Sequence, residues 1–189
     1  ALPDTVGGAG MGVGSAVPVF EALGSGLLGT PLLSTTLAGQ LIWRAAGESA
    51  ADWLGRLCGG AVATVALLDQ ADWGAANLGV ALNADGTLSG AKHYVADAGV
   101  ADVFIAVANE GGAPVLAIVE RDALDEGAIA QNTLIDLTKR AANVDFSGVV
   151  PAQVLRGESV ATALRDTLLL GALFTAAETA GAADKCLRS

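Results

Sequence analysis

The stretch Leu88-Ser-Gly-Ala-Lys-His-Tyr-Val-Ala-Asp-Ala-Gly-Val-Ala-Asp-Val-Phe-Ile-Ala-Val-Ala108 contains two apolar runs separated by a short polar corner. The runs, Leu88 to Val95 and Val103 to Ala108, predict two buried strands, because short apolar segments bounded by Gly and Asp are typical of strands. Upstream, Asn83-Ala-Asp-Gly86 predicts a tight turn. This turn pairs a strand from Leu78 to Asn83 with the run that begins at Leu88, as a hairpin.

The region around this stretch continues the strand pattern in both directions. Its connections, such as Asn109-Glu-Gly-Gly-Ala-Pro114, carry the Gly, Pro or Asp that turns require. Several strands at short spacing with no helix between them are typical of an antiparallel barrel or sandwich. We therefore predict a middle β-domain over residues 61–152. The other strands expected in it are Val62 to Leu68, Val115 to Glu120, Ile129 to Leu134 and Asn143 to Phe146.

Residues 1–60 predict the end of a helical domain. The glycine-rich run from Gly7 to Gly14 looks like a phosphate-binding loop, but no strand precedes it and no Lys-Ser/Thr pair follows it. We interpret it as a loop packed closely against neighbouring backbone. Three short helices follow, at Val17 to Leu23, Thr36 to Ala46 and Ala50 to Cys58, with Ser34, Thr35 and Thr36 as candidate N-caps of the second.

Residues 153–189 predict one long helix, from Ser159 to Arg188. Its segment from Thr167 to Ala177 is apolar on every side, and such a helix needs other helices or a partner subunit around it. The chain supplies no later helix to do this. We therefore expect the first helix of a C-terminal bundle that is incomplete and apparently truncated, which makes the fold class α+β.

Composition excludes several kinds of function. The net charge is −10 and only 10 residues are Lys or Arg, so the basic surface that a nucleic acid needs is not expected. Two distant cysteines, Cys58 and Cys186, and a single histidine, His93, predict neither a metal site nor a disulfide framework. The most apolar run has 11 residues, too few to cross about 30 Å of hydrocarbon. With no leader visible, we expect a cytoplasmic protein that does not enter a membrane.

Several short motifs resemble, in the same order, those of the flavin-dependent acyl-CoA dehydrogenase family. The resemblance spans essentially the whole chain, and the order of the motifs carries it rather than any single one. The family also has this layout of a helical part, a β-rich part and a further helical part. The motifs are Leu2-Pro-Asp-Thr-Val-Gly-Gly-Ala-Gly-Met-Gly12, Phe20-Glu-Ala-Leu-Gly24, Leu67-Leu-Asp69, Gly90-Ala-Lys-His-Tyr-Val95, Ala101-Asp-Val-Phe-Ile-Ala-Val-Ala108, Asp136-Leu-Thr-Lys-Arg140, Val144-Asp-Phe146 and Val149-Val-Pro-Ala152.

The resemblance implies an oxidoreductase of lipid metabolism. Its members use FAD to desaturate the α,β bond of an acyl-CoA, here a fatty acyl or sterol side-chain thioester, as in fatty acid β-oxidation. It further implies an electron-transfer flavoprotein as the electron acceptor and a homo- or hetero-oligomer, either a dimer or a tetramer. The alternative from another class is a non-catalytic partner subunit that completes a hetero-oligomeric acyl-CoA dehydrogenase.

The resemblance also implies the site residues. Leu67, Leu68, Tyr94 and Ala96 correspond to positions that lie against the flavin, and Trp73 lies in the loop that runs beside the acyl-CoA. Two threonine hydroxyls that bind the flavin ring in well-studied members are replaced here, by Leu68 and Ala96. Backbone amides at these positions could still serve the ring.

The catalytic base stays unknown at this stage. In most members it is a Glu that lies beyond the point where this sequence ends, and in the isovaleryl type it is at the position of Gly171. Glu178 follows seven residues later on the same helix, a rotation of roughly 700°, so it faces nearly the same side. It is the one weak candidate for the base. The alternative is a carboxylate paired with a neighbouring helix or placed at a wet interface.

Overall fold

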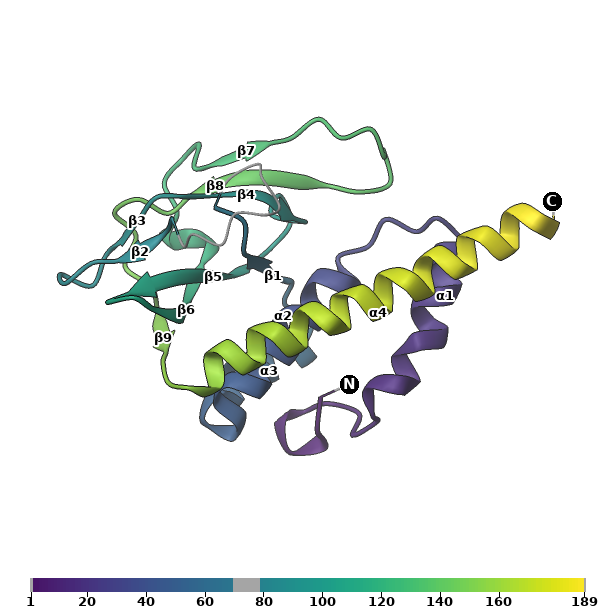
Figure 1. The fold of residues 1–189 in the computed structure, drawn as a ribbon, viewed down its shortest axis with the longest axis horizontal. Helices are drawn as coiled ribbons and strands as arrows, with labels where there is room; N and C mark the ends of the chain where they lie inside the picture. Colours follow the sequence, from purple (N-terminus) through teal and green to yellow (C-terminus); the bar gives the residue numbers. More distant parts are fainter. Residues whose placement is uncertain (1, 70–78, 189) are drawn as a thin grey trace.

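The computed structural model describes residues 2–69 and 79–188 of the 189-residue chain. Helices lie at one side and two small sheets at the other, with the long helix α4 running the length of the helical part (Figure 1). The helices are α1 Val17–Ser25, α2 Leu32–Ala46, α3 Ala51–Cys58 and α4 Ser159–Arg188. The strands are β1 Ala63–Ala66, β2 Ala81–Leu82, β3 Leu88–Ser89, β4 Ala91–Ala96, β5 Val103–Glu110, β6 Ala113–Glu120, β7 Ile129–Gln131, β8 Ala141–Asp145 and β9 Gln153–Leu155.

The larger sheet is built around β5 and β6, which pair antiparallel with Val103 opposite Glu120. The predicted hairpin is the antiparallel pair of β2 and β3, with Ala81 opposite Ser89. The strand order is β3-β2-β5-β6-β9, and β1 also pairs with β5. The β1–β5 and β2–β5 pairs are parallel, so the sheet is mixed rather than wholly antiparallel. The strand predicted from Leu88 to Val95 is divided at Gly90, whose φ of 101° is open to glycine and strained for other residues.

The second sheet, in the order β4-β8-β7, carries the polar corner of the chain. Its pairing shifts register between Lys92 and Val95, where Tyr94 adopts a φ of 49°. This β-bulge re-aims the side chains that follow it. Lys92 and Val95 are buried, whereas Tyr94 and Ala96 are exposed on the other side.

The core lies on both faces of the larger sheet, which explains why β5 is apolar at successive positions. Phe104, Ala106 and Ala108 pack toward the second sheet. The alternate residues Val103, Ile105 and Val107 pack with helices α2 and α3. The small side chains allow close approach, as the composition of 52% hydrophobic but only 4% aromatic residues suggests.

Helix α2 begins earlier than predicted, and the predicted N-caps are wrong. Ser34, Thr35 and Thr36 lie inside α2, because Pro31 precedes the first turn and starts the helix at Leu32. The hydroxyls of Ser34 and Thr35 make tertiary contacts instead. Ser34 donates to the Asp97 carboxylate at 2.6 Å, and the Thr35 hydroxyl accepts from the Ala63 amide at 3.2 Å. These bonds fasten the helical part to the β-rich part.

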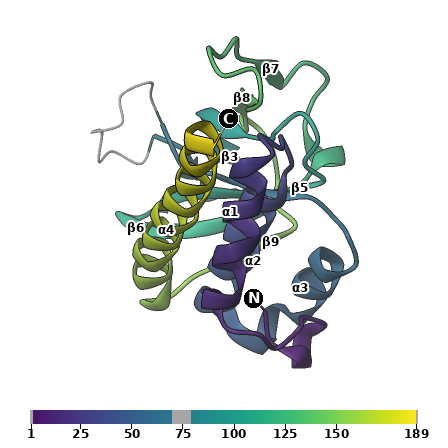
Figure 2. The same cartoon turned by 90° about the vertical axis from the view of Figure 1, so that its right-hand side faces the viewer.

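Helix α4 packs along α1 and α2, and Figure 2 shows α1 and α4 side by side. Phe174 of α4 stacks on Phe20 of α1 with ring centroids 4.4 Å apart. On the opposite face Leu168 and Leu169 are 56% and 65% exposed, as expected for a helix that is apolar on every side. By length and mean hydropathy alone α4 could span a membrane, but apolar core helices of soluble proteins have the same properties.

Candidate functional site

A cavity of about 300 Å³ opens where the polar corner meets the helices. Tyr94, Ala96 and Asp97 form one wall, and Thr175 and Glu178 of α4 form another. The remaining lining comes from residues 134–141, which connect β7 to β8, and from the start of α2: Thr30, Leu33, Ser34, Leu134, Thr138, Lys139, Arg140 and Ala141. The cavity therefore lies between elements that are far apart in the sequence, and α4 meets the β-rich part here.

The corner itself is held by side chains from neighbouring strands. The Thr64 hydroxyl donates to the Ala96 carbonyl at 2.6 Å, and the Tyr94 amide donates to Asn143 Oδ1 at 3.2 Å. Because the bulge points Val95 inward, Tyr94 and Ala96 both face the cavity. The Tyr94 side chain is 42% exposed there.

Asp97 anchors the end of the corner, although nothing in the sequence pattern marks it. Its φ is 54°, and its amide donates to the Arg140 carbonyl at 3.0 Å. Its carboxylate accepts from Ser34 at 2.6 Å and lies 3.4 Å from the Arg140 guanidinium. Asp97 thus joins α2, β4 and the segment before β8 at the cavity wall.

Glu178 lies on the cavity wall as an ion-paired carboxylate. Its Oε1 is 2.5 Å from Lys139 Nζ, and its side chain is 18% exposed against 46% for Lys139. The sequence left open that Glu178 is a paired carboxylate rather than a base, and the structure shows such a pair. The partner, Lys139, comes from the β-rich part rather than from a neighbouring helix. A base must receive a proton on a free oxygen. A proton transferred to Glu178 would have to bind Oε2, or Oε1 after the ion pair with Lys139 has opened.

Two predicted site residues, Leu67 and Leu68, do not line this cavity. Leu67 and Leu68 follow β1 and are half-buried. The Leu68 carbonyl accepts from the His93 amide at 2.7 Å, which places Leu68 beside the corner strand. Trp73 lies outside the described residues. The structure thus brings Tyr94, Ala96 and Glu178 around one cavity, and places Leu68 beside the corner strand at His93.

A buried ion pair, Lys92 with Asp69, lies beside the corner and was not predicted from the sequence. The Lys92 side chain is fully buried, and its ammonium contacts the Asp69 carboxylate and the Leu67 carbonyl, the latter at 3.0 Å. Burial lowers the pKa of Lys92 below its ordinary value, and the hydrogen bond and charge of Asp69 oppose that shift. The only signal in the sequence was a lysine inside an apolar strand.

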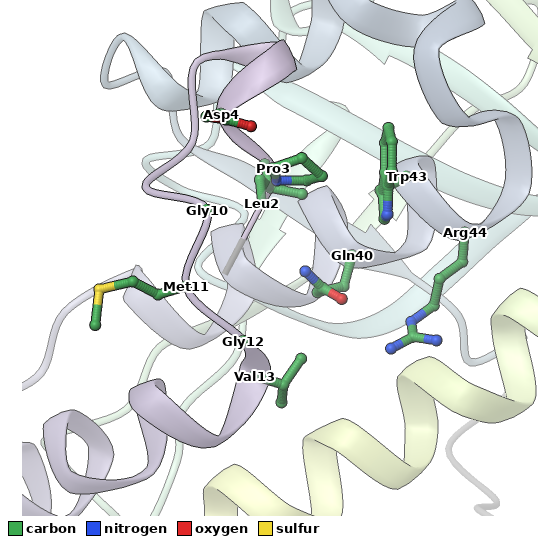
Figure 3. A pocket seen from close by; sticks show the side chains of 10 residues that line it. All are labelled: Leu2, Pro3, Asp4, Gly10, Met11, Gly12, Val13, Gln40, Trp43 and Arg44. Atoms are coloured by element: carbon green, nitrogen blue, oxygen red, sulfur yellow. The ribbon is translucent and has the colours of Figure 1, made fainter.

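A second cavity, of about 370 Å³, lies between the N-terminal loop and α2. Figure 3 shows Trp43 and Arg44 of α2 facing Leu2, Pro3 and Val13 across it. Arg44 is already paired with Asp166 at 3.4 Å. A Cβ at Gly8 would stand 2.1 Å from the Leu2 carbonyl oxygen, so the glycine-rich run packs closely against backbone at this residue, whereas a Cβ at Gly12 or Gly14 has nothing within 4 Å. This cavity holds none of the predicted site residues.

Within residues 2–69 and 79–188, His, Cys, Asp and Glu side chains form no cluster of three that could hold a metal ion. The corner cavity has the properties that a flavin ring requires. Its walls are largely apolar, with Tyr94 and Ala96 on one side and polar groups such as Thr138, Lys139 and Arg140 at the margin. Its volume is at the low end for small-molecule sites and suits the ring rather than the whole dinucleotide. Tyr94 and Ala96 would contact the ring, and the ion pairs Lys139–Glu178 and Arg140–Asp97 would lie at its margin.

Comparison with known proteins gives matches in structure only: no protein-family model matches, and no curated protein matches. The "Tcur3481-Tcur3483 steroid ACAD G363A variant" matches with a TM-score of 0.80 and 28% identity, covering 100% of this chain and 51% of that chain. The ChsE4-ChsE5 complex from Mycobacterium tuberculosis matches with a TM-score of 0.71 and 26% identity, over 96% and 49% of the two chains. Butyryl-CoA dehydrogenase from Megasphaera elsdenii matches with a TM-score of 0.81 and 23% identity, over 98% and 54%.

The chain thus spans about half the length of the solved structures that it matches. The names steroid ACAD and butyryl-CoA dehydrogenase agree with the family that the sequence motifs indicated, and the order of helices, sheets and long helix is the one expected from that family. The chain has the acyl-CoA dehydrogenase fold and matches a part of that family, about half the length of its members.

Proposed function

We propose that this chain is part of a FAD-dependent acyl-CoA dehydrogenase that desaturates the α,β bond of an acyl thioester. One observation carries the proposal: the corner residues Tyr94 and Ala96 face Glu178 of α4 across a single cavity. In such a reaction a hydride acceptor and a base must lie on opposite sides of the substrate. Solved structures that match the chain include glutaryl-CoA dehydrogenase in complex with glutaryl-CoA and PigA in complex with FAD.

The residues of this chain have distinct roles in the proposed reaction. FAD, when bound, supplies the acceptor for the hydride that leaves the β-carbon. Tyr94 and Ala96 form the wall against which the ring rests and keep water from that side. Lys139 and Arg140 lie at the margin, each paired with a carboxylate of the same lining, Glu178 and Asp97 respectively. Glu178 is the candidate that takes the α-proton. Its Oε1 is paired with Lys139, so the proton would bind Oε2 unless the pair opens.

An absorption spectrum of the purified protein, followed by anaerobic addition of butyryl-CoA, octanoyl-CoA or a steroid acyl-CoA, tests the proposal. We expect a flavin band that bleaches with at least one of these thioesters. A protein that binds added FAD but keeps its band with every thioester would contradict the dehydrogenase proposal. Bleaching that persists in Glu178→Gln would remove Glu178 as the base and leave the dehydrogenase proposal in place.

The second candidate function is a non-catalytic partner subunit of a hetero-oligomeric acyl-CoA dehydrogenase. Two observations favour it: Leu68 and Ala96 lack the hydroxyls expected at the flavin, and Glu178 is engaged by Lys139. Two matching structures are named as pairs, Tcur3481-Tcur3483 and ChsE4-ChsE5. Activity that arises only on co-expression with a second acyl-CoA dehydrogenase chain would support this candidate. Full activity of the chain alone would exclude it.

Three further features belong to the proposal. An electron-transfer flavoprotein is the proposed electron acceptor, and a homo- or hetero-oligomer is the proposed assembly. The cytoplasm is the proposed location, since the two free thiols, Cys58 and Cys186, fit a reducing compartment.

A further inference from the structure

We infer that Asn143 and Asn132 are positioning residues, which hold the bulge that turns Tyr94 toward the corner cavity. Through Tyr94 they set how this wall of the cavity meets the flavin ring. The inference rests on the proposed function, because it takes the corner cavity as the site of the ring. Neither asparagine is among the described residues that line the cavity, so each acts through Tyr94 rather than by touching the ring.

The bulge decides which side chains of β4 face the cavity. Between the paired residues on either side of it, β4 has two residues, His93 and Tyr94, and β8 has one, Asn143. The extra residue reverses the alternation that follows, so Tyr94 and Ala96 line the cavity while Val95 is buried. Without it, strict alternation would bury the tyrosine and present Val95 to the cavity.

The corner carries backbone strain at two residues. Tyr94 has a φ of 49° and Asp97 a φ of 54°, both in the left-handed region that costs energy outside glycine. Such conformations collect at functional sites and persist only where surrounding contacts fix them. Asp97 is fixed by its contacts with Ser34 and Arg140. Tyr94 therefore needs a fixing contact of its own.

Asn143 supplies this contact from the opposite strand. A bulge leaves its extra residue out of the ladder of backbone hydrogen bonds, and here the Tyr94 amide donates to Asn143 Oδ1 at 3.2 Å. Ala142 and Val144 are buried, so alternation places the Asn143 side chain on the same face of the sheet as Tyr94. An asparagine oxygen thus replaces a backbone carbonyl at the point where β8 is one residue short.

Asn132, directly after β7, orients the Asn143 side chain. Its Nδ2 donates to Asn143 Oδ1 at 3.3 Å, and its own amide donates to the Ala141 carbonyl at 2.9 Å. Asn132 Oδ1 is buried and has no hydrogen-bond partner within residues 2–69 and 79–188. A buried acceptor without a partner destabilises a fold. Asn132 therefore gives up stability at one atom while its other atom holds Asn143 Oδ1 toward Tyr94, which fits a positioning role better than a purely structural one.

The first readout uses the fact that Tyr94 is the only tyrosine in the sequence. Protein labelled with ¹⁵N-tyrosine gives a single backbone amide signal in NMR, and its exchange with solvent reports on the hydrogen bond to Asn143. We expect exchange about tenfold faster in Asn143→Leu, as the loss of one hydrogen bond implies. Asn143→Asp keeps an oxygen acceptor and should retain slow exchange.

Asn132→Leu tests the orientation without removing the bond to Tyr94. It should speed exchange of the Tyr94 amide less than Asn143→Leu does. Because it also removes the unpartnered oxygen, its urea midpoint should equal or exceed that of the wild type. This variant keeps the comparison available if Asn143→Leu does not fold.

The second readout is the dissociation constant for FAD, measured from the change in flavin fluorescence on binding. Asn143→Leu should weaken FAD binding by about tenfold, Asn132→Leu should weaken it by less, and Asn143→Asp should stay close to the wild type. Asn109→Leu is the matched control. Asn109 Oδ1 accepts from the Gly112 amide at 2.7 Å, a bond of the same kind at the turn between β5 and β6. Asn109→Leu should lower the urea midpoint and leave both readouts unchanged.

The outcomes separate this inference from the proposed function. Unchanged FAD binding in Asn143→Leu, with or without faster exchange, would overturn the positioning role and leave the proposed function standing. Equal losses of FAD binding in Asn109→Leu would also overturn it, because they would assign the effect to general destabilisation. A wild-type protein that binds no FAD would overturn the proposed function and this inference together.

Discussion

Replacing Gly24 by alanine should open the crossing of α1 and α4. The added Cβ would stand 1.8 Å from the Glu178 carbonyl oxygen and 2.6 Å from its carbonyl carbon. Ordinary contact begins at 3.4 Å, so the helices must separate by about 1.6 Å at this point. No side-chain rotation can relieve the clash, because both atoms belong to the main chain of a helix.

The expected cost combines three effects. Overpacking of this kind costs about 1–3 kcal/mol. Separation of the helices also weakens the stack of Phe20 on Phe174, and an aromatic pair contributes about 0.5–1.5 kcal/mol. Alanine returns about 1 kcal/mol through its higher helix propensity. The net loss is about 2 kcal/mol, which lowers the melting temperature of a chain of this length by about 4–8 °C.

The assay is thermal unfolding followed by far-ultraviolet circular dichroism, with Gly55→Ala as the control. Gly55 also lies in a helix, α3, but a Cβ there has nothing within 4 Å, so alanine should raise the melting temperature. Gly181 faces the Glu21 carbonyl oxygen at the same crossing, again at 1.8 Å for its Cβ. A single separation of α1 and α4 relieves both clashes. The double variant Gly24→Ala/Gly181→Ala should therefore lose less stability than the two single variants added together. A Gly24→Ala protein that melts at or above the wild-type temperature would refute this account.

Three other predictions concern charged groups. Lys92→Met should cost about 3–5 kcal/mol in urea unfolding, because Asp69 would remain buried without its partner. Burial lowers the pKa of Lys92 in the folded protein, so just below pH 10.5 the unfolded chain binds more protons than the folded one. The free energy of unfolding of the wild-type protein should therefore rise with pH in this range, and that rise should be missing in Lys92→Met. The Arg121 guanidinium donates to the carbonyls of Ala98 and Ala101 in the corner turn, at 3.1 and 3.0 Å. Arg121→Lys should therefore lower the free energy of unfolding by about 1.5–3 kcal/mol in urea. An unchanged urea midpoint would contradict this role of Arg121. The Arg156 guanidinium holds the pKa of Glu110 below its ordinary 4.5, and carboxyl titration by NMR should show the shift disappear in Arg156→Gln.

The sequence predicted the secondary structure well where the pattern is local and strong. The hairpin of β2 and β3 followed from the Asn83-Ala-Asp-Gly86 turn, and α4 followed from its length and composition. Hydrophobic periodicity and turn chemistry depend on neighbours within a few residues, so they are visible without the fold. The ends of the helices were predicted less accurately. Helix α2 was predicted to begin at Thr36 but begins four residues earlier, at Leu32, directly after Pro31.

The functional cavity was only partly predictable. The family resemblance named Tyr94, Ala96 and Glu178 separately, and the tertiary structure alone placed them around one space. The bulge at Tyr94 could not be read from strand alternation, because a positive φ at a non-glycine residue is imposed by the packing around it.

What the sequence determined by itself is the order of the elements and the apolar faces that they bury. What only the tertiary structure decided is which distant polar groups meet. Ser34 and Asp97 are 63 positions apart, and Lys139 and Glu178 are 39 apart, yet each pair is in direct contact. The physical reason is that burial favours any arrangement that removes apolar surface from water, whereas hydrogen bonds and ion pairs act only at short range. The polar partners of this chain are therefore set by the packing of its helices on its sheets.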